Sequence, residues 1–216
     1  IIKYDSEGNA EWAKAIGGSS TDQIQSVAET SDGGYIAGGD FASSSGIDLG
    51  NGVTLSNNGS TDGMIIKYDS AGNVRWAKPI GGSEEDQITS VAETSDGGYI
   101  AGGYFNSSSI DLGNGVTLNN NGFQDGMIIK YDSAGNAQWA KAIGGSDSEE
   151  INSVAETRDG GYIAGGEFGG NIDLGNGVTL NNNDAQDGMI IKIAEEMGVP
   201  EVQEITVENN IKEFKI

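Results

Sequence analysis

The stretch IIKYDSAGNVRWAKPIGGSEEDQITSVAETSDGGYIAGGYF, residues 65–105, decides the fold because the chain repeats it almost letter for letter. Its opening phrase begins at Ile1, Ile65 and Ile128, and a shortened copy, IIKIAEE, begins at Ile190. These starting points are 64, 63 and 62 residues apart. Repetition at a nearly fixed period indicates one supersecondary unit per copy, which buries its apolar faces by stacking on its neighbours.

Each copy predicts four principal β-strands and no helix. Residues 88–94 and 98–105 are β-prone runs joined by the turn Ser-Asp-Gly, and residues 125–132 and 137–143 are joined by the turn Ser-Ala-Gly-Asn. The polar connection between these two pairs contains Asn114-Gly115, the favoured pair for a two-residue hairpin turn. A small side hairpin is therefore predicted in each copy.

The strand containing Trp-Ala-Lys is predicted to be the outermost of the four. Pro79 lies in it, and proline cannot donate a hydrogen bond to a sheet. Lys78 precedes this proline and protects an edge from further pairing. The strand Gly-Tyr-Ile-Ala-Gly-Gly is rich in small residues, which indicates a crowded inner position. This order predicts an all-β fold of β-propeller-like blades, each with four antiparallel strands.

The number of blades does not make a closed ring. Residues 1–16 supply two outer strands, 22–80 and 86–143 supply two complete blades, and 149–193 supply three further strands. Propellers have about four to eight blades. We therefore expect an incomplete ring, or one completed by missing sequence or by a second chain. An open β-repeat array or a β-prism is the alternative.

The repeat region is assigned to residues 1–193, and the character of the sequence changes after it. Residues 194–216 lack glycine-rich turns. They form either a tail that packs on the last blade or the start of a following β-module. Because the chain opens in the middle of a repeat, we expect it to be an excerpt of a longer protein.

The motifs of each copy resemble those of a known repeat family. MIIKYDS-x-GN-xx-W-xx-IGG, followed by D-x-I-x-SVA-x-T-x-DGGYIAGG, is similar to the bacterial beta-propeller repeats called SBBP repeats. The resemblance covers residues 1 to about 193. It implies propeller blades, and a place in a secreted or cell-surface protein of a bacterium.

Composition excludes several classes of function. Acidic residues outnumber basic ones 33 to 11, which gives a net charge of −22. Such a field repels nucleic acid and anionic membranes and favours cations or basic partners. The chain has no cysteine and no histidine, so thiol catalysis, disulfides, the usual zinc sites and imidazole triads are absent. No apolar run approaches the length of about 20 residues that spans a membrane.

One turn offers weak candidates for metal ligands. Asp5, Glu7 and Asn9 place oxygen atoms at alternate positions, as calcium loops do. Ala71 and Ala134 replace Glu7 in the later copies. The alternative is a hairpin turn in which the aspartate caps its own backbone, and this is the interpretation that we prefer. We accordingly predict no cofactor, with calcium as the alternative.

The repeated tryptophans, Trp12, Trp76 and Trp139, are predicted to be docking residues that pack between adjacent blades, because each copy has one at the same position. No catalytic residue is predicted. The acidic clusters at 84–86 and 147–150 are expected to be solvated loops. The copies differ mainly at positions that we expect at the surface, one set of which is Asp40, Tyr104 and Glu167.

The sequence favours a non-catalytic structural or binding module, a scaffold or adhesin. The expected partner is a protein or a glycan bound at the variable loops 42–46, 106–109 and 169–171, and self-association could complete the ring. Two alternatives stay open. One is a carbohydrate-active propeller enzyme that uses paired carboxylates, and the other is an adhesive array stabilised by calcium.

Overall fold

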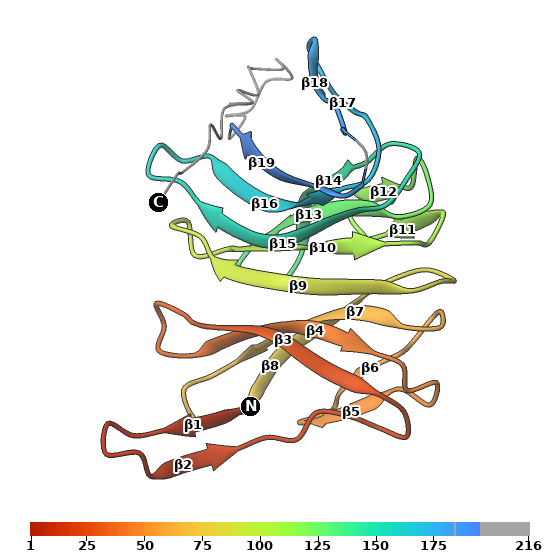
Figure 1. Cartoon of the computed structure of the whole chain (residues 1–216). Coiled ribbons are helices and arrows are strands. Elements are labelled where there is room, and N and C mark those ends of the chain that lie inside the picture. The colour runs from red at the N-terminus through yellow and green to blue at the C-terminus, as the bar shows by residue number, and fades with distance from the viewer. Residues whose placement is uncertain (184, 195–216) are drawn as a thin grey trace.

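The computed structural model describes residues 1–183 and 185–194, and every regular element in these ranges is a β-strand (Figure 1). The prediction of an all-β chain is therefore confirmed. The described ranges contain no helix long and apolar enough to cross a membrane. The tail or following module predicted at 194–216 lies outside the described residues from position 195 onward.

Two sheets of four antiparallel strands form complete blades. The first blade has the order β3 (Asp22–Glu29), β4 (Tyr35–Phe41), β7 (Asp62–Tyr68) and β8 (Val74–Ile80). The second has the order β9 (Asp86–Glu93), β10 (Tyr99–Phe105), β13 (Asp125–Tyr131) and β14 (Ala137–Ile143). The predicted four strands per copy are confirmed, and the strand with Trp-Ala-Lys is at the edge of both blades.

Two incomplete sheets lie at the ends of the stack. The N-terminal one pairs β1 (Ile2–Tyr4) with β2 (Ala10–Ala13). The C-terminal one, called the third blade below, has the order β15 (Glu149–Glu156), β16 (Tyr162–Phe168) and β19 (Asp187–Ile193). The described part of the chain is an incomplete propeller-like stack and does not close into a ring (Figure 1).

A small side hairpin follows the second strand of each blade. The three hairpins are β5 (Ile47–Gly50) with β6 (Val53–Leu55), β11 (Ser109–Asp111) with β12 (Thr117–Asn119), and β17 (Ile172–Gly175) with β18 (Val178–Leu180). Asn114 has a φ of 55° and Gly115 a φ of 78°. These left-handed conformations explain why the sequence uses Asn-Gly at the hairpin turn.

The blades stack face to face, and apolar side chains fill the interfaces (Figure 1). Ile36 and Ile65 of the first blade share a core with Ile88 and Val91 of the second, and none of the four is more than 5% exposed. The interface between the second and third blades uses the equivalent residues, Ile100, Ile128, Ile151 and Val154. Burial of these side chains drives the stacking.

Glycine is required where the blades approach most closely. A Cβ atom on Gly38 would lie 2.6 Å from Cγ1 of Val91 in the next blade, and one on Gly102 would lie 2.6 Å from Cγ1 of Val154. Contacts this short exclude any side chain at the glycine. The valine of one blade therefore fills the space above the glycine of the preceding blade, which explains the small residues of β4 and β10.

A buried lysine holds two turns together within each complete blade. Lys130 is 3% exposed. Its Nζ donates to both carboxylate oxygens of Asp96, at 3.1 and 2.8 Å, and to the carbonyl oxygen of Tyr131 at 3.1 Å. Burial opposes ionisation of Asp96, but hydrogen bonds from Lys130 and Thr94 outweigh it and lower the pKa of this carboxyl to about 2. Lys67 and Asp32 form the same pair in the first blade.

Replacing Lys130 tests how much its pair with Asp96 contributes to the free energy of unfolding. We expect Lys130→Met to lower the free energy of unfolding by about 1–3 kcal/mol at neutral pH, because hydrogen bonds to charged groups are lost. The difference from wild type should shrink as the pH falls from about 4 to about 2, since protonation of Asp96 abolishes the same contribution. Urea denaturation across this range measures it.

Lys192→Met is the matched control for this variant. Lys192 pairs with Asp159 in the third blade, but its side chain is 46% exposed. An exposed pair contributes less than a buried one. A loss for Lys192→Met as large as that for Lys130→Met would contradict our account of the buried pair.

Carboxylates at the starts of several strands are buried. Asp62 and Asp86 are 0% exposed, and each accepts the main-chain N–H of the residue four positions earlier at 2.8 Å. Glu149 is also 0% exposed and accepts the N–H of Gly145 at 2.8 Å. The expectation that residues 84–86 and 147–150 are simply solvated is therefore wrong for Asp86 and Glu149, which tie the loops between blades to the sheets.

Asp62 gives the stability a pH dependence of opposite sign to that of Asp96. Burial and the nearby charge of Asp86 raise the pKa of Asp62 to about 6, and the N–H of Asn58 only partly offsets this. Its folded-state pKa is thus higher than the ordinary 3.8. Ionised Asp62 costs stability above about pH 6, and this cost disappears as the pH falls from about 6 to about 4.

The variant Asp62→Asn tests this cost. We expect it to raise the free energy of unfolding at pH 7 by about 1–2 kcal/mol and to flatten the pH dependence between 6 and 4. Urea denaturation at several pH values measures both. Asp48→Asn, at an exposed hairpin residue, is the control and should leave this dependence unchanged. If Asp62→Asn leaves the pH dependence of the free energy of unfolding between pH 6 and 4 unchanged, carboxyl groups other than Asp62 produce that dependence.

Candidate functional site

The three repeated tryptophans lie at the interfaces between successive sheets. Trp76 of β8 contacts the ring of Tyr99 in the next blade edge-on, with the ring centroids 5.6 Å apart. Its indole N–H donates to the carbonyl oxygen of Ser133 at 3.3 Å, and a Cβ on Gly135 would lie 2.9 Å from the indole. The equivalent pairs are Trp12 with Tyr35 and Trp139 with Tyr162, at 5.5 and 5.4 Å. Each tryptophan packs against the following blade.

Truncating one tryptophan tests this packing. We expect Trp76→Ala to lower the free energy of unfolding by about 2–4 kcal/mol, because a large side chain between two blades is removed. Trp12→Ala is the matched control, since Trp12 belongs to the two-stranded hairpin at the end of the stack. It should loosen β1 and β2 with little effect on global unfolding, as urea denaturation and amide hydrogen exchange would show. Equal effects of the two variants would contradict this assignment.

The weak calcium candidates lie in a turn that is capped by its own aspartate. Asp5 Oδ1 accepts the N–H of Glu7 at 2.9 Å and that of Asn9 at 2.8 Å, and Oδ2 accepts the Asn9 amide at 3.0 Å. Hydrogen bonds from Asn9, and then that from Glu7, lower the pKa of Asp5. Within residues 1–183 and 185–194, no group of three or more acidic side chains is placed to hold a metal ion.

The variable positions Asp40, Tyr104 and Glu167 lie in equivalent places near the ends of β4, β10 and β16. The Tyr104 hydroxyl donates to Glu85 Oε1 at 2.9 Å. Burial raises the pKa of Asp40, and the charge of Glu85 in the following blade adds to this. Burial likewise raises the pKa of Glu150, with a contribution from Glu167. Asp40 and Glu85 form one pair of mutually repelling carboxylates, and Glu150 and Glu167 form another. The Tyr104 hydroxyl lies within reach of charges from both pairs. We call these five residues the acidic row.

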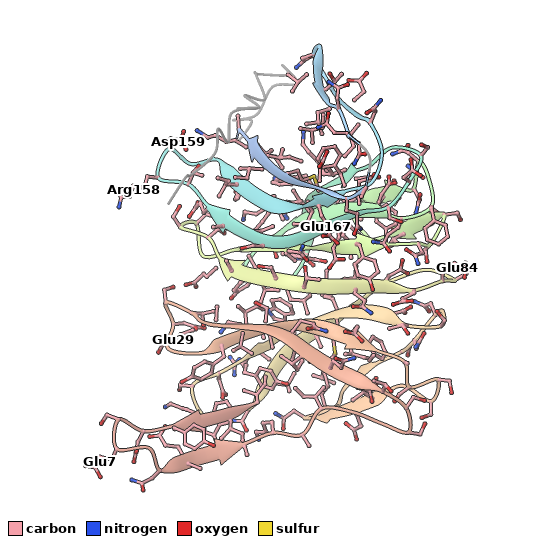
Figure 2. The ribbon with its side chains drawn as sticks, viewed as in Figure 1. Glu7, Glu29, Glu84, Arg158, Asp159 and Glu167 are labelled. Carbon is pink, nitrogen blue, oxygen red and sulfur yellow. The ribbon has the colours of Figure 1, made fainter. Side chains whose placement is uncertain are left out.

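The three variable loops begin just beyond this row. Ser43, in loop 42–46, donates its hydroxyl to Asp22 at 2.9 Å, and Ser107, in loop 106–109, donates to Asp86 at 2.6 Å. The loop bases are therefore fixed by the carboxylates at the strand starts. Together with the row, these loops form one end of the stack, the loop end, where Glu84 is exposed (Figure 2).

A shallow hollow of about 450 Å³, largely open to solvent and called the cavity below, lies at the loop end between loops of the second and third blades. It is lined by Phe123, Asp147, Ser148, Gly169, Ala185 and Gln186. Phe123 is 71% exposed. The other copies have Ser60 and Ala185 at this position, so the aromatic ring makes the site specific to one place in the repeat. Sequence reasoning missed Phe123, although its lone occurrence among otherwise matching copies was a usable signal.

The composition of this cavity limits its chemistry. Among its described lining residues, only Asp147 carries a carboxylate. Glycoside hydrolysis in its common form uses two carboxyl groups, about 5–5.5 Å or 6.5–9.5 Å apart. An exposed aromatic ring with one carboxylate and the amide of Gln186 is instead an arrangement that holds a ligand by stacking and hydrogen bonding. The loop 169–171 reaches this cavity through Gly169.

The chain is similar in sequence to parts of two much longer proteins. The chain is 26% identical over 159 residues to the regulatory protein FlaEY of Caulobacter vibrioides, which covers 71% of this chain and 16% of that protein. It is 29% identical over 140 residues to the uncharacterized WD repeat-containing protein L264 of Acanthamoeba polyphaga mimivirus, which covers 61% of this chain and 10% of that one. No family model matches the chain.

The likeness to a WD-repeat protein agrees with the four-stranded blades in the structure. This chain is a β-propeller-like repeat module. It spans 16% and 10% of the lengths of the two relatives, so it corresponds to a small part of each.

Proposed function

We propose that this repeat module is non-catalytic and binds a glycan in the cavity around Phe123. The observation that carries the proposal is the 71% exposed ring of Phe123 beside Asp147 and Gln186 at the loop end. Ligand sites are lined by apolar and aromatic side chains together with a few polar groups, and this is the combination found here. The ring offers a flat apolar face, and the polar neighbours offer hydrogen bonds at its rim.

Sugars match these features. The C–H face of a pyranose ring packs on an aromatic ring, while its hydroxyl groups donate to a carboxylate and exchange hydrogen bonds with an amide. The acidic row disfavours polyanionic ligands, so the expected glycan is neutral or carries amino groups. The repeated carboxylates elsewhere hold loops and turns, which supports a binding role over catalysis.

The proposed setting is a bacterial protein that is secreted or displayed on the cell surface, where the module serves as a scaffold or adhesin. The resemblance of its motifs to SBBP repeats supports this setting, and so does a net charge of −22, which keeps the chain soluble and away from anionic membranes.

A binding screen with Phe123→Ala tests the function. We expect the full chain to be retained on one or more neutral or amino-sugar polysaccharides, such as cell-wall polymers, and to release no soluble sugar from them. Phe123→Ala should weaken retention about tenfold or more, because the stacking surface is lost. Tyr4→Ala is the matched control, since Tyr4 is a 56% exposed aromatic residue on β1.

Two results would overturn the proposal. One is release of sugar fragments over time, which would mean an enzyme. The other is retention that Phe123→Ala and Tyr4→Ala leave equally unchanged, which would place any ligand elsewhere.

A further inference from the structure

Two buried carboxylates meet where the second and third blades join. Asp125 begins β13 and Glu149 begins β15, and both residues are 0% exposed. A parallel bridge between Gln124 and Ser148 brings the starts of these strands side by side, and the N–H of Glu149 donates to the carbonyl oxygen of Gln124 at 2.9 Å. Burial raises the pKa of Glu149, and the negative charge of Asp125 raises it further. The two carboxylates are therefore close enough to repel each other.

Each of these carboxylates has one oxygen atom that accepts no hydrogen bond. Asp125 Oδ2 accepts the main-chain N–H of Asn121 at 3.0 Å and its side-chain amide at 2.9 Å. Glu149 Oε2 accepts the N–H of Gly145 at 2.8 Å. Asp125 Oδ1 and Glu149 Oε1 are buried without a partner among the described residues. Buried charges in proteins are paired or coordinate metal ions, so this pair of oxygens indicates a ligand.

Both carboxylates lie against the same glycine turn. A Cβ on Gly144 would lie 2.2 Å from Asp125 Oδ1, and Glu149 is bonded to the N–H of the next residue, Gly145. The carbonyl oxygen of Asn171 would lie 2.5 Å from a Cβ on Gly145. Glycine at both positions lets two carboxylates and one main-chain carbonyl group approach the same short piece of main chain.

The interface between the first and second blades shows how such a carboxylate is satisfied by the protein itself. Asp86 stands at the same position of the repeat as Glu149. It accepts the N–H of Gly82 at 2.8 Å, the N–H groups of Asn106 and Ser107 at 3.1 Å each, and the Ser107 hydroxyl at 2.6 Å. Both oxygens of Asp86 are thereby bonded, and no ligand is needed.

The third copy of the repeat has lost the hydroxyl donor. Gly170 takes the place of Ser107, and the longer Glu149 takes the place of Asp86. The corresponding serine of the first copy, Ser43, also donates to the aspartate at the start of its blade. Two copies thus use a hydroxyl group where the third has none, and Glu149 Oε1 is the atom left without a donor.

We propose that Asp125, Glu149 and the carbonyl oxygen of Asn171 bind a calcium ion between the second and third blades. The ion replaces the missing hydroxyl as the partner of Glu149 and gives Asp125 Oδ1 a partner as well. A set made only of oxygen atoms suits Ca²⁺, and water molecules complete its shell of about 6–8 ligands. Mg²⁺ fits less well, because it gives up its water reluctantly and demands an octahedral shell.

This site is separate from the places considered so far. It uses two acidic side chains, so it is not one of the groups of three or more that the described residues lack. Asp5 and Asn9, in the turn that resembles a calcium loop, are bonded to each other instead. The ion would tie loop 169–171 to the strand starts through Asn171, which is the task that Ser107 performs in the preceding copy. The proposal does not depend on a glycan in the cavity.

Isothermal titration calorimetry of the full chain with calcium chloride tests the proposal. The protein is first treated with a chelator, which is then removed by dialysis, and sodium chloride at about 0.15 M screens general attraction to the acidic surface. We expect one calcium ion per chain with a dissociation constant of about 10⁻⁴–10⁻³ M, as in weak calcium sites. Millimolar calcium should also raise the melting temperature by a few degrees, because the ion binds the folded state.

Two conservative variants locate the ion. Asp125→Asn and Glu149→Gln keep the shape of each side chain but remove its charge, and each should weaken calcium binding about tenfold or more. Asp62→Asn is the matched control, since Asp62 stands at the same position of the repeat as Asp125 but lies beside the fully bonded Asp86. It should leave calcium binding unchanged. Circular dichroism checks that each variant is folded.

Phe123→Ala separates this site from the proposed glycan site. Phe123 lines the cavity and is not a ligand of the ion, so this variant should bind calcium as wild type does. Loss of glycan retention with unchanged calcium binding would leave the calcium site standing on its own evidence.

Three outcomes would overturn the calcium site. Wild type could show neither heat of binding nor a change in melting temperature at millimolar calcium, which would mean that water or protons meet the two free oxygens. Several ions could bind weakly with affinities that Asp125→Asn and Glu149→Gln leave unchanged, which would mean general attraction to the acidic surface. Finally, Asp62→Asn could weaken binding as much as Asp125→Asn, which would place the ion elsewhere.

Discussion

The face-to-face contact between successive sheets is the constraint on which the rest of this structure depends. Gly38 and Gly102 leave room for Val91 and Val154, and any side chain at either glycine would collide with the next blade. No single blade buries its own apolar surface, so each needs a neighbour on both sides. The stability of the stack is therefore shared among the interfaces between blades.

Polar contacts around each apolar interface fix how the blades are oriented. At one end of the strands, Glu93 accepts two hydrogen bonds from Ser31 of the preceding blade. On the outer edge, Trp76 packs on Tyr99 and bonds to Ser133 of the following one. Apolar contact alone is not directional, whereas these bonds specify one arrangement. These repeated polar residues thus hold successive blades in one orientation.

The repeating architecture could be predicted from the sequence because the signals for edge strands and tight turns lie within short segments of the chain. Pro79 and Lys78 indicate an edge strand by their own chemistry, and Asn114-Gly115 indicates a tight turn in the same way. The burial of Asp86 and Glu149 could not be predicted, because it depends on loop N–H groups that fold over them. The cavity around Phe123 could not be predicted either, because it too depends on contacts between distant segments. Its lining comes from segments near 123, 147, 169 and 185, which only the stacking of two blades brings together.

In a chain of near-identical copies, function is best sought where the copies differ. A residue present in every copy at one position is explained by the contact that every copy makes, as the tryptophans are. Phe123 and Arg158 have no such explanation, since the matching positions hold small residues in the other copies. The aromatic ring is exposed at the loop end, and the arginine is exposed on the third blade. Each departure places an aromatic or charged group at a surface that the shared contacts between blades do not use.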